Sequence, residues 1–157
     1  MVDRLAIAAD EDSLIADAGL VLPATLASRL GLAELFDARI TGGAHPAQKC
    51  LTVIASALAG GDCIDDVNAL RAGATGAVLG HRVAAASTVG TFLRSLGWGH
   101  ARQFDAVSRQ LLARAAGIGA IDTAAERCVV DIDATLVETY GLAKRGGAQV
   151  MRTGRRG

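Results

Sequence analysis

The sequence is poor in aromatic residues and in proline. Only 3% of its 157 residues are aromatic and two are proline, whereas 51% are hydrophobic. A folded core must therefore be built mainly from Ala, Leu, Val and Ile, and a hydrophobic fraction this high argues against a disordered chain. At this length we expect one domain, or one small domain plus a piece of another.

Long uninterrupted apolar runs are also missing. The run 51–59 is interrupted at Ser56 and bounded by Lys49 and Asp62, so it falls short of the roughly 20 apolar residues of a membrane span. The N-terminus carries acidic residues at 10–12, where a signal peptide would have an apolar stretch after a basic leader. We therefore expect a cytoplasmic protein with no membrane partner.

Neither cysteine nor histidine shows the spacing of metal ligands. Cys50, Cys63 and Cys128 are scattered in apolar surroundings without a C-x-x-C pair. They predict buried, reduced thiols, with no zinc or disulfide role. The histidines are equally dispersed and are expected at surface or capping positions: His45, His81 and His100.

The formal net charge is zero, but the charges are distributed unevenly. The first 138 residues hold 11 basic and 16 acidic residues. From Thr139 onward there is no acidic residue, and the basic ones are Lys144, Arg145, Arg152, Arg155 and Arg156. A basic tail of this kind binds phosphate without sequence preference, although it is as often a solvated chain end.

Apolar residues at helical spacing predict a series of helices along the first 122 residues. Ser87 and Thr88 are expected to cap one helix. The stretch 97–100 is expected to end that helical segment before the next helix begins. In that next helix Arg102 and Arg109 lie on the more polar side. The expected helices span about 23–30, a second from 33, 46–59, 62–71, 87–96 and 102–116.

The acidic group Asp62, Asp65 and Asp66 falls in the first turn of the expected helix 62–71. Carboxylates are stabilised there by the positive end of the helix dipole. We therefore favour a helix-terminal role over metal binding for these residues.

An apolar, β-branched run around residues 128–136 predicts a buried strand after the helices. Side chains alternate along a strand, so Asp131, Asp133 and Thr135 would share one face. Two buried carboxylates repel each other, and a bound metal ion would offset that repulsion. The alternative is a turn in which Asp133 and Thr135 cap a helix that begins near Leu136.

The string Asp-x-Asp-x-Thr-Leu at 131–136 resembles two families. It is similar to the first motif of haloacid-dehalogenase-type phosphatases, which implies Asp131 as nucleophile and Asp133 as acid/base. It also resembles the first catalytic strand of DDE-type insertion-sequence transposases, which implies Asp133 as a metal ligand. The string alone fits both.

The upstream sequence favours the transposase resemblance. Several separated blocks resemble the helical N-terminal region of DDE insertion-sequence transposases, and the similarity covers roughly 18–144. By contrast, only 24 residues follow Asp133, and Glu138 is the last acidic one, whereas the phosphatase family needs later strands with further acidic residues. The blocks that carry the resemblance are 42–49, 59–67, 70–73, 87–94, 98–100, 103–105 and 138–144.

The resemblance implies a mainly α fold, in which a helical N-terminal region is followed by the first strand of an incomplete RNase H-like α/β domain. We expect a DNA-associated helical region at 1–122, the start of a truncated catalytic domain at 123–149, and a basic tail outside the family pattern at 150–157. A reading-frame shift near 146–149 would account for this end.

The family holds two Mg²⁺ or Mn²⁺ ions with two Asp and one Glu, and cleaves and joins DNA. By carry-over Asp133 is the first member of that triad, and Asp131 is a neighbouring metal-ligand candidate. The second Asp and the Glu have no counterpart, so we expect an inactive chain that does not bind the ions stably.

The implied partners are insertion-sequence DNA ends, with a second copy or a full-length transposase. The alternatives are a non-enzymatic module that competes for DNA or transposase, and a phosphatase fragment that uses Asp131. The candidate DNA contacts are Arg94, Arg102, Arg109, Lys144 and Arg145.

Overall fold

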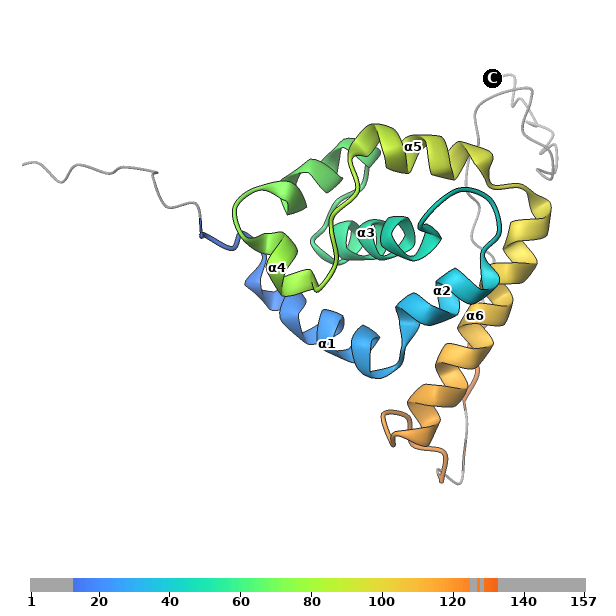
Figure 1. Cartoon of the computed structure of the whole chain (residues 1–157). Helices are drawn as coiled ribbons and strands as arrows, with labels where there is room; N and C mark the ends of the chain where they lie inside the picture. The colour runs from blue at the N-terminus through green and yellow to red at the C-terminus, as the bar shows by residue number, and fades with distance from the viewer. Residues whose placement is uncertain (1–12, 125–126, 128, 133–157) are drawn as a thin grey trace, which may run out of the picture. The chain divides into compact units, whose positions relative to one another are not determined.

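A computed structural model of the chain describes residues 13–124, 127 and 129–132 (Figure 1). Contacts divide the chain into two units, Met1–Asp122 and Thr123–Gly157. The described part of the first unit is built from α-helices and 3₁₀-helices. In chain order they are η1 (Ala18–Leu20), α1 (Val21–Arg29), α2 (Leu32–Arg39), α3 (Pro46–Leu58), η2 (Ile64–Arg71), α4 (Thr75–Leu79), α5 (Ala86–Ser95) and α6 (Trp98–Gly117).

The prediction of a mainly helical chain is confirmed, whereas the predicted buried strand is not. Within the described residues no segment is a strand. Val129, Val130 and Ile132 are 84%, 73% and 89% exposed. An apolar run is buried only where a neighbouring surface covers it, and periodicity alone does not supply that surface. The rest of the predicted strand, including Asp133, lies outside the described residues.

Helix α3 lies in the middle of the first unit, with α1, α2, η2 and α5 around it (Figure 1). Its residues enter both core clusters. Ala47 and Cys50 pack with residues of α2, α5 and α6, including Phe36, Phe92 and Val107. Ala55 packs in the second cluster, with Leu20, Leu70, Leu79 and Val83. One amphipathic helix thus connects two separate apolar cores.

Two polar contacts fix α3 against its neighbours. At its N-terminus Pro46 is the first helical residue, where its missing N–H costs nothing. The following Ala47 N–H donates to Asp37 Oδ1 of α2 at 3.1 Å. In the middle of the helix the buried Thr52 hydroxyl donates to the Gln48 carbonyl at 2.8 Å and accepts the Ala84 N–H at 3.0 Å. The hydroxyl is therefore satisfied without water.

The starts of α5 and α6 differ from the sequence prediction. Helix α5 has no side-chain cap and begins at Ala86, so Ser87 and Thr88 are helical residues and the predicted capping role is wrong. Helix α6 begins at Trp98, so the predicted break at 97–100 is instead its first turn. That turn forms because the Gly97 N–H donates to His100 Nδ1 at 2.9 Å.

Of the two cysteines within the described residues, one confirms the prediction of buried thiols, and Cys128 lies outside those residues. Cys50 is buried, and this burial raises the pKa of its thiol to about 11, with a further rise from the nearby Asp37 carboxylate. Cys63 is exposed, so the prediction of burial is wrong for this residue. It directly precedes η2, whose buried side chains are Val67 and Leu70.

The turn after α3 leaves no room for a side chain at Gly61. A Cβ atom there would lie 2.5 Å from Ser56 Oγ, 2.9 Å from Asp66 Cβ and 3.0 Å from the Ser56 carbonyl oxygen. The Gly61 N–H also donates to that carbonyl at 2.8 Å, which holds the turn against the end of α3. Close backbone approach, and not a positive φ, therefore requires glycine at 61.

We predict that Gly61→Ala lowers the free energy of unfolding by about 1–3 kcal/mol, the usual cost of inserting a methyl group into a packed site. Chemical denaturation measured by circular dichroism would show it. Gly99→Ala is the matched control, because a Cβ there meets open space within α6. Equal stability of the two variants would contradict the packing argument.

Candidate nucleic-acid interface

The predicted catalytic residue Asp133 and two of the predicted DNA contacts, Lys144 and Arg145, lie outside the described residues. Asp131 is described, and it is exposed in a segment that is neither helix nor strand. Among the described residues it belongs to no cluster of three potential metal ligands. Among the described residues, the remaining candidates for a functional site lie on the helices.

Helix α6 packs on α2 through one of its faces. Val107 is buried in the core, and Phe104 meets the Phe36 ring edge-on with centroids 6.3 Å apart. Farther along the helix, Arg114 Nη1 donates to the Leu30 carbonyl at 2.7 Å and to the Gly31 carbonyl at 3.0 Å. Arg114 thus binds two carbonyls of the turn between α1 and α2, and its charge has a structural role.

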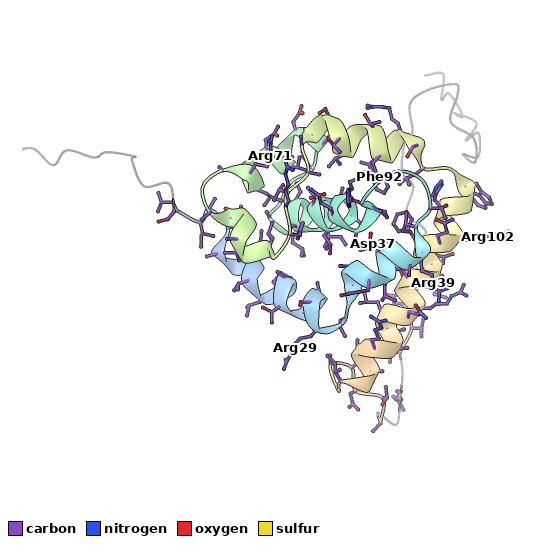
Figure 2. All side chains as sticks on the ribbon, viewed as in Figure 1. Arg29, Asp37, Arg39, Arg71, Phe92 and Arg102 are labelled. Carbon is purple, nitrogen blue, oxygen red and sulfur yellow. The ribbon has the colours of Figure 1, made fainter. Side chains whose placement is uncertain are left out.

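The outer face of α6 carries the predicted arginines. Arg102 and Arg109 are both exposed. Seven residues along a helix make about two turns, so the two side chains project from the same side about 10.5 Å apart. Trp98, one turn before Arg102, is 74% exposed, and Asp105 is also exposed on this helix. Figure 2 shows Arg102 on α6, close in this view to Arg39 of α2.

Arg94 lies on a different helix from the other two arginines. Its Nη2 lies 3.5 Å from Thr91 Oγ1 on α5, and its guanidinium covers Gly90, where a Cβ would come within 3.2 Å. The structure therefore brings Arg102 and Arg109 onto one face, and places Arg94 on α5 beside the hydroxyl of Thr91.

A hollow of about 520 Å³ lies beside α5. We call it the α5 pocket. Its lining comes from two stretches far apart in the sequence: 42–49, which holds the loop before α3 and the start of α3, and 87–100, which holds α5 and the first turn of α6. The lining residues are Gly42, Gly43, Lys49, Ser87, Thr88, Thr91, Phe92, Ser95 and His100. Sequence analysis had not identified this site.

The loop that borders the α5 pocket is held by α6. Gln103 Oε1 accepts the Thr41 N–H at 2.9 Å, and Gln103 Nε2 donates to Thr41 Oγ1 at 2.8 Å. His100 Nε2 lies 3.0 Å from the Thr41 carbonyl oxygen. Because His100 Nδ1 accepts the Gly97 N–H, its proton is on Nε2 and is donated to Thr41.

Comparison with protein-family models, with curated proteins and with solved structures finds no match to this chain.

A second hollow, of about 600 Å³, is lined mainly by apolar residues of α1, α3 and α4. Leu26, Ile54 and Leu58 are exposed along it. His81 also lines it. The His81 Nδ1 atom donates to the Leu79 carbonyl at 3.0 Å, and its buried Nε2 has no protein partner among the described residues. Burial lowers the pKa of His81, which keeps the ring neutral.

Among the described residues no single helix is long and apolar enough to cross a membrane; the bent pair Ala18–Arg29 and Leu32–Arg39 meets the length and composition criteria only when both helices are taken together.

We predict that His100 and His81 are opposite neutral tautomers, with the proton on Nε2 of His100 and on Nδ1 of His81. Their hydrogen-bond partners require this arrangement. Long-range ¹H–¹⁵N correlation spectra recorded at about pH 8, above the ordinary histidine pKa of about 6.5, would show it. The exposed His45 serves as the solvent-averaged reference. Finding the same tautomer at both positions would contradict the assignment.

Of the acidic group predicted in a first helical turn, Asp66 forms a cap, whereas Asp62 lies before η2, which begins at Ile64. Asp62, Cys63 and Asp66 have potential ligand atoms within 4.8 Å of one another. However, Asp66 Oδ2 already accepts the N–H groups of Asp62 and Cys63, both at 2.9 Å. These bonds, above all the one from the Cys63 backbone, lower the pKa of Asp66. The geometry favours the helix-terminal role over metal binding.

We predict that Asp66→Asn lowers stability at neutral pH and that its difference from the parent chain shrinks under acid conditions. A carboxyl whose folded-state pKa is depressed stabilises the fold above its unfolded pKa of about 3.9 and loses this contribution as the pH falls through the folded value. Denaturation midpoints measured from about pH 7 down to about pH 2 would test this. Asp105→Asn removes another exposed carboxylate and controls for net charge. A difference for Asp66→Asn that stays constant with pH would refute the linkage.

Proposed function

We propose that the helical unit is the DNA-associated N-terminal region of a DDE-type insertion-sequence transposase. The observation that carries the DNA-binding part of this proposal is the outer face of α6, where Arg102 and Arg109 project two turns apart, while Arg114 of the same helix hydrogen-bonds backbone carbonyls of the α1–α2 turn. The transposase part rests on the sequence resemblance over 18–144.

The chemistry of this face suits the phosphate backbone. An arginine guanidinium donates in a planar fork that matches two phosphate oxygens. The exposed Trp98 adds an aromatic surface on which an unpaired base can stack. Guanidinium–phosphate contacts and stacking on Trp98 do not distinguish one base from another. The binding would therefore be largely independent of base sequence.

In this proposal Asp133 is the first metal-binding carboxylate of an RNase H-like domain, with Asp131 as its neighbour. In the intact family this carboxylate helps to hold Mg²⁺ or Mn²⁺, which would stabilise the attacking and leaving oxygens of a DNA strand. Because the second Asp and the Glu of the family have no counterpart in this sequence, we expect this chain not to hold the ions stably. The partners would be insertion-sequence ends, together with a second copy or a full-length transposase.

A second candidate is a non-enzymatic module that binds DNA or full-length transposase as a competitor. It is favoured by one observation: among the described residues, the buried members of both core clusters lie between Leu20 and Val107, within the helical unit.

We predict that replacing Arg102 and Arg109 with alanine weakens binding to a generic DNA duplex and makes it less salt-sensitive. Each lost phosphate contact lowers the log–log salt slope by about 0.9, so the double variant should lose about 1.8. Fluorescence anisotropy over a range of salt concentrations measures this slope.

The matched control is Arg29→Ala with Arg71→Ala. It removes the same charge from two exposed positions on other elements, α1 and η2 (Figure 2). Its slope should stay close to that of the parent chain. A slope that falls equally in both double variants would mean that net charge, and not the α6 face, governs binding.

A further inference from the structure

The α5 pocket contains a half-buried cation whose described partners are uncharged. Lys49 donates from Nζ to the Ala44 carbonyl, and the same atom lies 5.3 Å from the centroid of the Phe92 ring. A carbonyl oxygen and an aromatic face stabilise an ammonium group but do not neutralise it. A partly desolvated charge of this kind is best compensated by an anion.

The pocket wall opposite the loop supplies hydroxyl groups. Among the described residues the side chains of Ser87 and Thr88 make no hydrogen bond, so both O–H groups are available to donate. Thr91 is committed, because its hydroxyl donates to the Ser87 carbonyl at 2.9 Å. The Arg94 guanidinium, 3.5 Å from Thr91 Oγ1, adds a second positive charge beside this wall.

The loop wall is made of glycine where it approaches the cation. Gly42 and Gly43 have φ values of 93° and 83°, which side-chain-bearing residues rarely adopt. A Cβ at Gly43 would lie 3.6 Å from Lys49 Nζ, and one at Gly42 would lie 3.4 Å from His100 Nε2. Side chains at these positions would fill the space beside the ammonium group.

None of the residues that line the α5 pocket is acidic. Its polar groups are one ammonium, one imidazole and four hydroxyls. The imidazole and the hydroxyls of Thr91 and Ser95 already donate to backbone carbonyls. The donors that remain are the Lys49 ammonium and the hydroxyls of Ser87 and Thr88, and no carboxylate of the lining would repel an anion. We propose that the α5 pocket binds a phosphate group, whose oxygens accept hydrogen bonds from Lys49 Nζ and from the hydroxyls of Ser87 and Thr88.

This inference goes beyond the proposed function, which concerns the outer face of α6. Two sources share the phosphate chemistry: a nucleic-acid backbone and a free phosphate. With a nucleic-acid backbone as the source, DNA must reach the α5 pocket, whereas free phosphate can enter without DNA. Titrations with phosphate and with DNA distinguish the two sources.

The experiment uses the full chain, labelled with ¹⁵N, and titrates inorganic phosphate at constant ionic strength. We expect saturable shifts at the amides of Gly42, Gly43 and Ser87. Lys49→Gln should weaken this binding about tenfold or more, and Lys49→Arg, which keeps the charge, should retain most of it. Arg71→Gln removes the same charge from an exposed site and should bind phosphate like the parent chain.

A DNA duplex is then titrated in place of phosphate. Shifts of the same pocket amides would support the proposal with the DNA backbone as the source. Shifts confined to α6, with phosphate still bound in the pocket, would support it with free phosphate as the source. The Arg102→Ala, Arg109→Ala double variant should bind phosphate normally, so failure of the α6 proposal and failure of the pocket proposal can be told apart.

The proposal is overturned if phosphate causes no saturable shift in the parent chain, or if Lys49→Gln binds it as well as Arg71→Gln does. Should Lys49→Gln fail to fold, the double change Ser87→Ala, Thr88→Ala provides the second test, because both residues are exposed on α5. Phosphate affinity of that variant equal to the parent's would also overturn the proposal.

Discussion

The packing of α3 between two apolar clusters is the constraint on which the rest of the helical unit depends. Cys50 enters the cluster with Phe92, and Ala55 enters the cluster on the other side. Between them the buried Thr52 hydroxyl accepts the Ala84 N–H, and a group left unpaired there would cost about 1–3 kcal/mol. Because Lys49 directly precedes Cys50, the packing that buries the thiol also places the ammonium group over Phe92.

Helix α3 was predictable because every local signal agrees. Pro46 can only begin a helix, apolar residues recur at helical spacing, and Gly60, with a φ of 89°, ends it. The first turn of α6 was missed for the opposite reason. Two glycines flank Trp98, which suggests a break, and the turn is stabilised by an imidazole that accepts the Gly97 N–H from three residues away. The low helix propensity of glycine takes no account of such a side-chain contact.

The candidate site was predictable to the extent that it depends on one helix. The polar side of α6 follows from periodicity, so Arg102 and Arg109 could be selected in advance. The α5 pocket could not be, because it forms only when the stretch 42–49, with Gly43 and Lys49, packs against the stretch 87–100, with Ser87 and His100. The predicted strand failed over 129–132 for a related reason: β-branched residues favour a strand, but burial requires a covering surface that local sequence does not specify.

The charge balance decides what kind of DNA association this unit can support. Residues 13–124 contain nine basic and eight acidic side chains, so the helical unit is nearly neutral. A field this weak gives little long-range attraction to DNA, and encounter would not be strongly steered. DNA binding would then depend on the positions of individual cationic side chains. The Arg114 guanidinium is already committed to carbonyls of the α1–α2 turn, whereas Arg102 and Arg109 are exposed and Lys49 faces a pocket without acidic residues. Affinity would therefore come from a few local phosphate contacts, each of which a single substitution can remove.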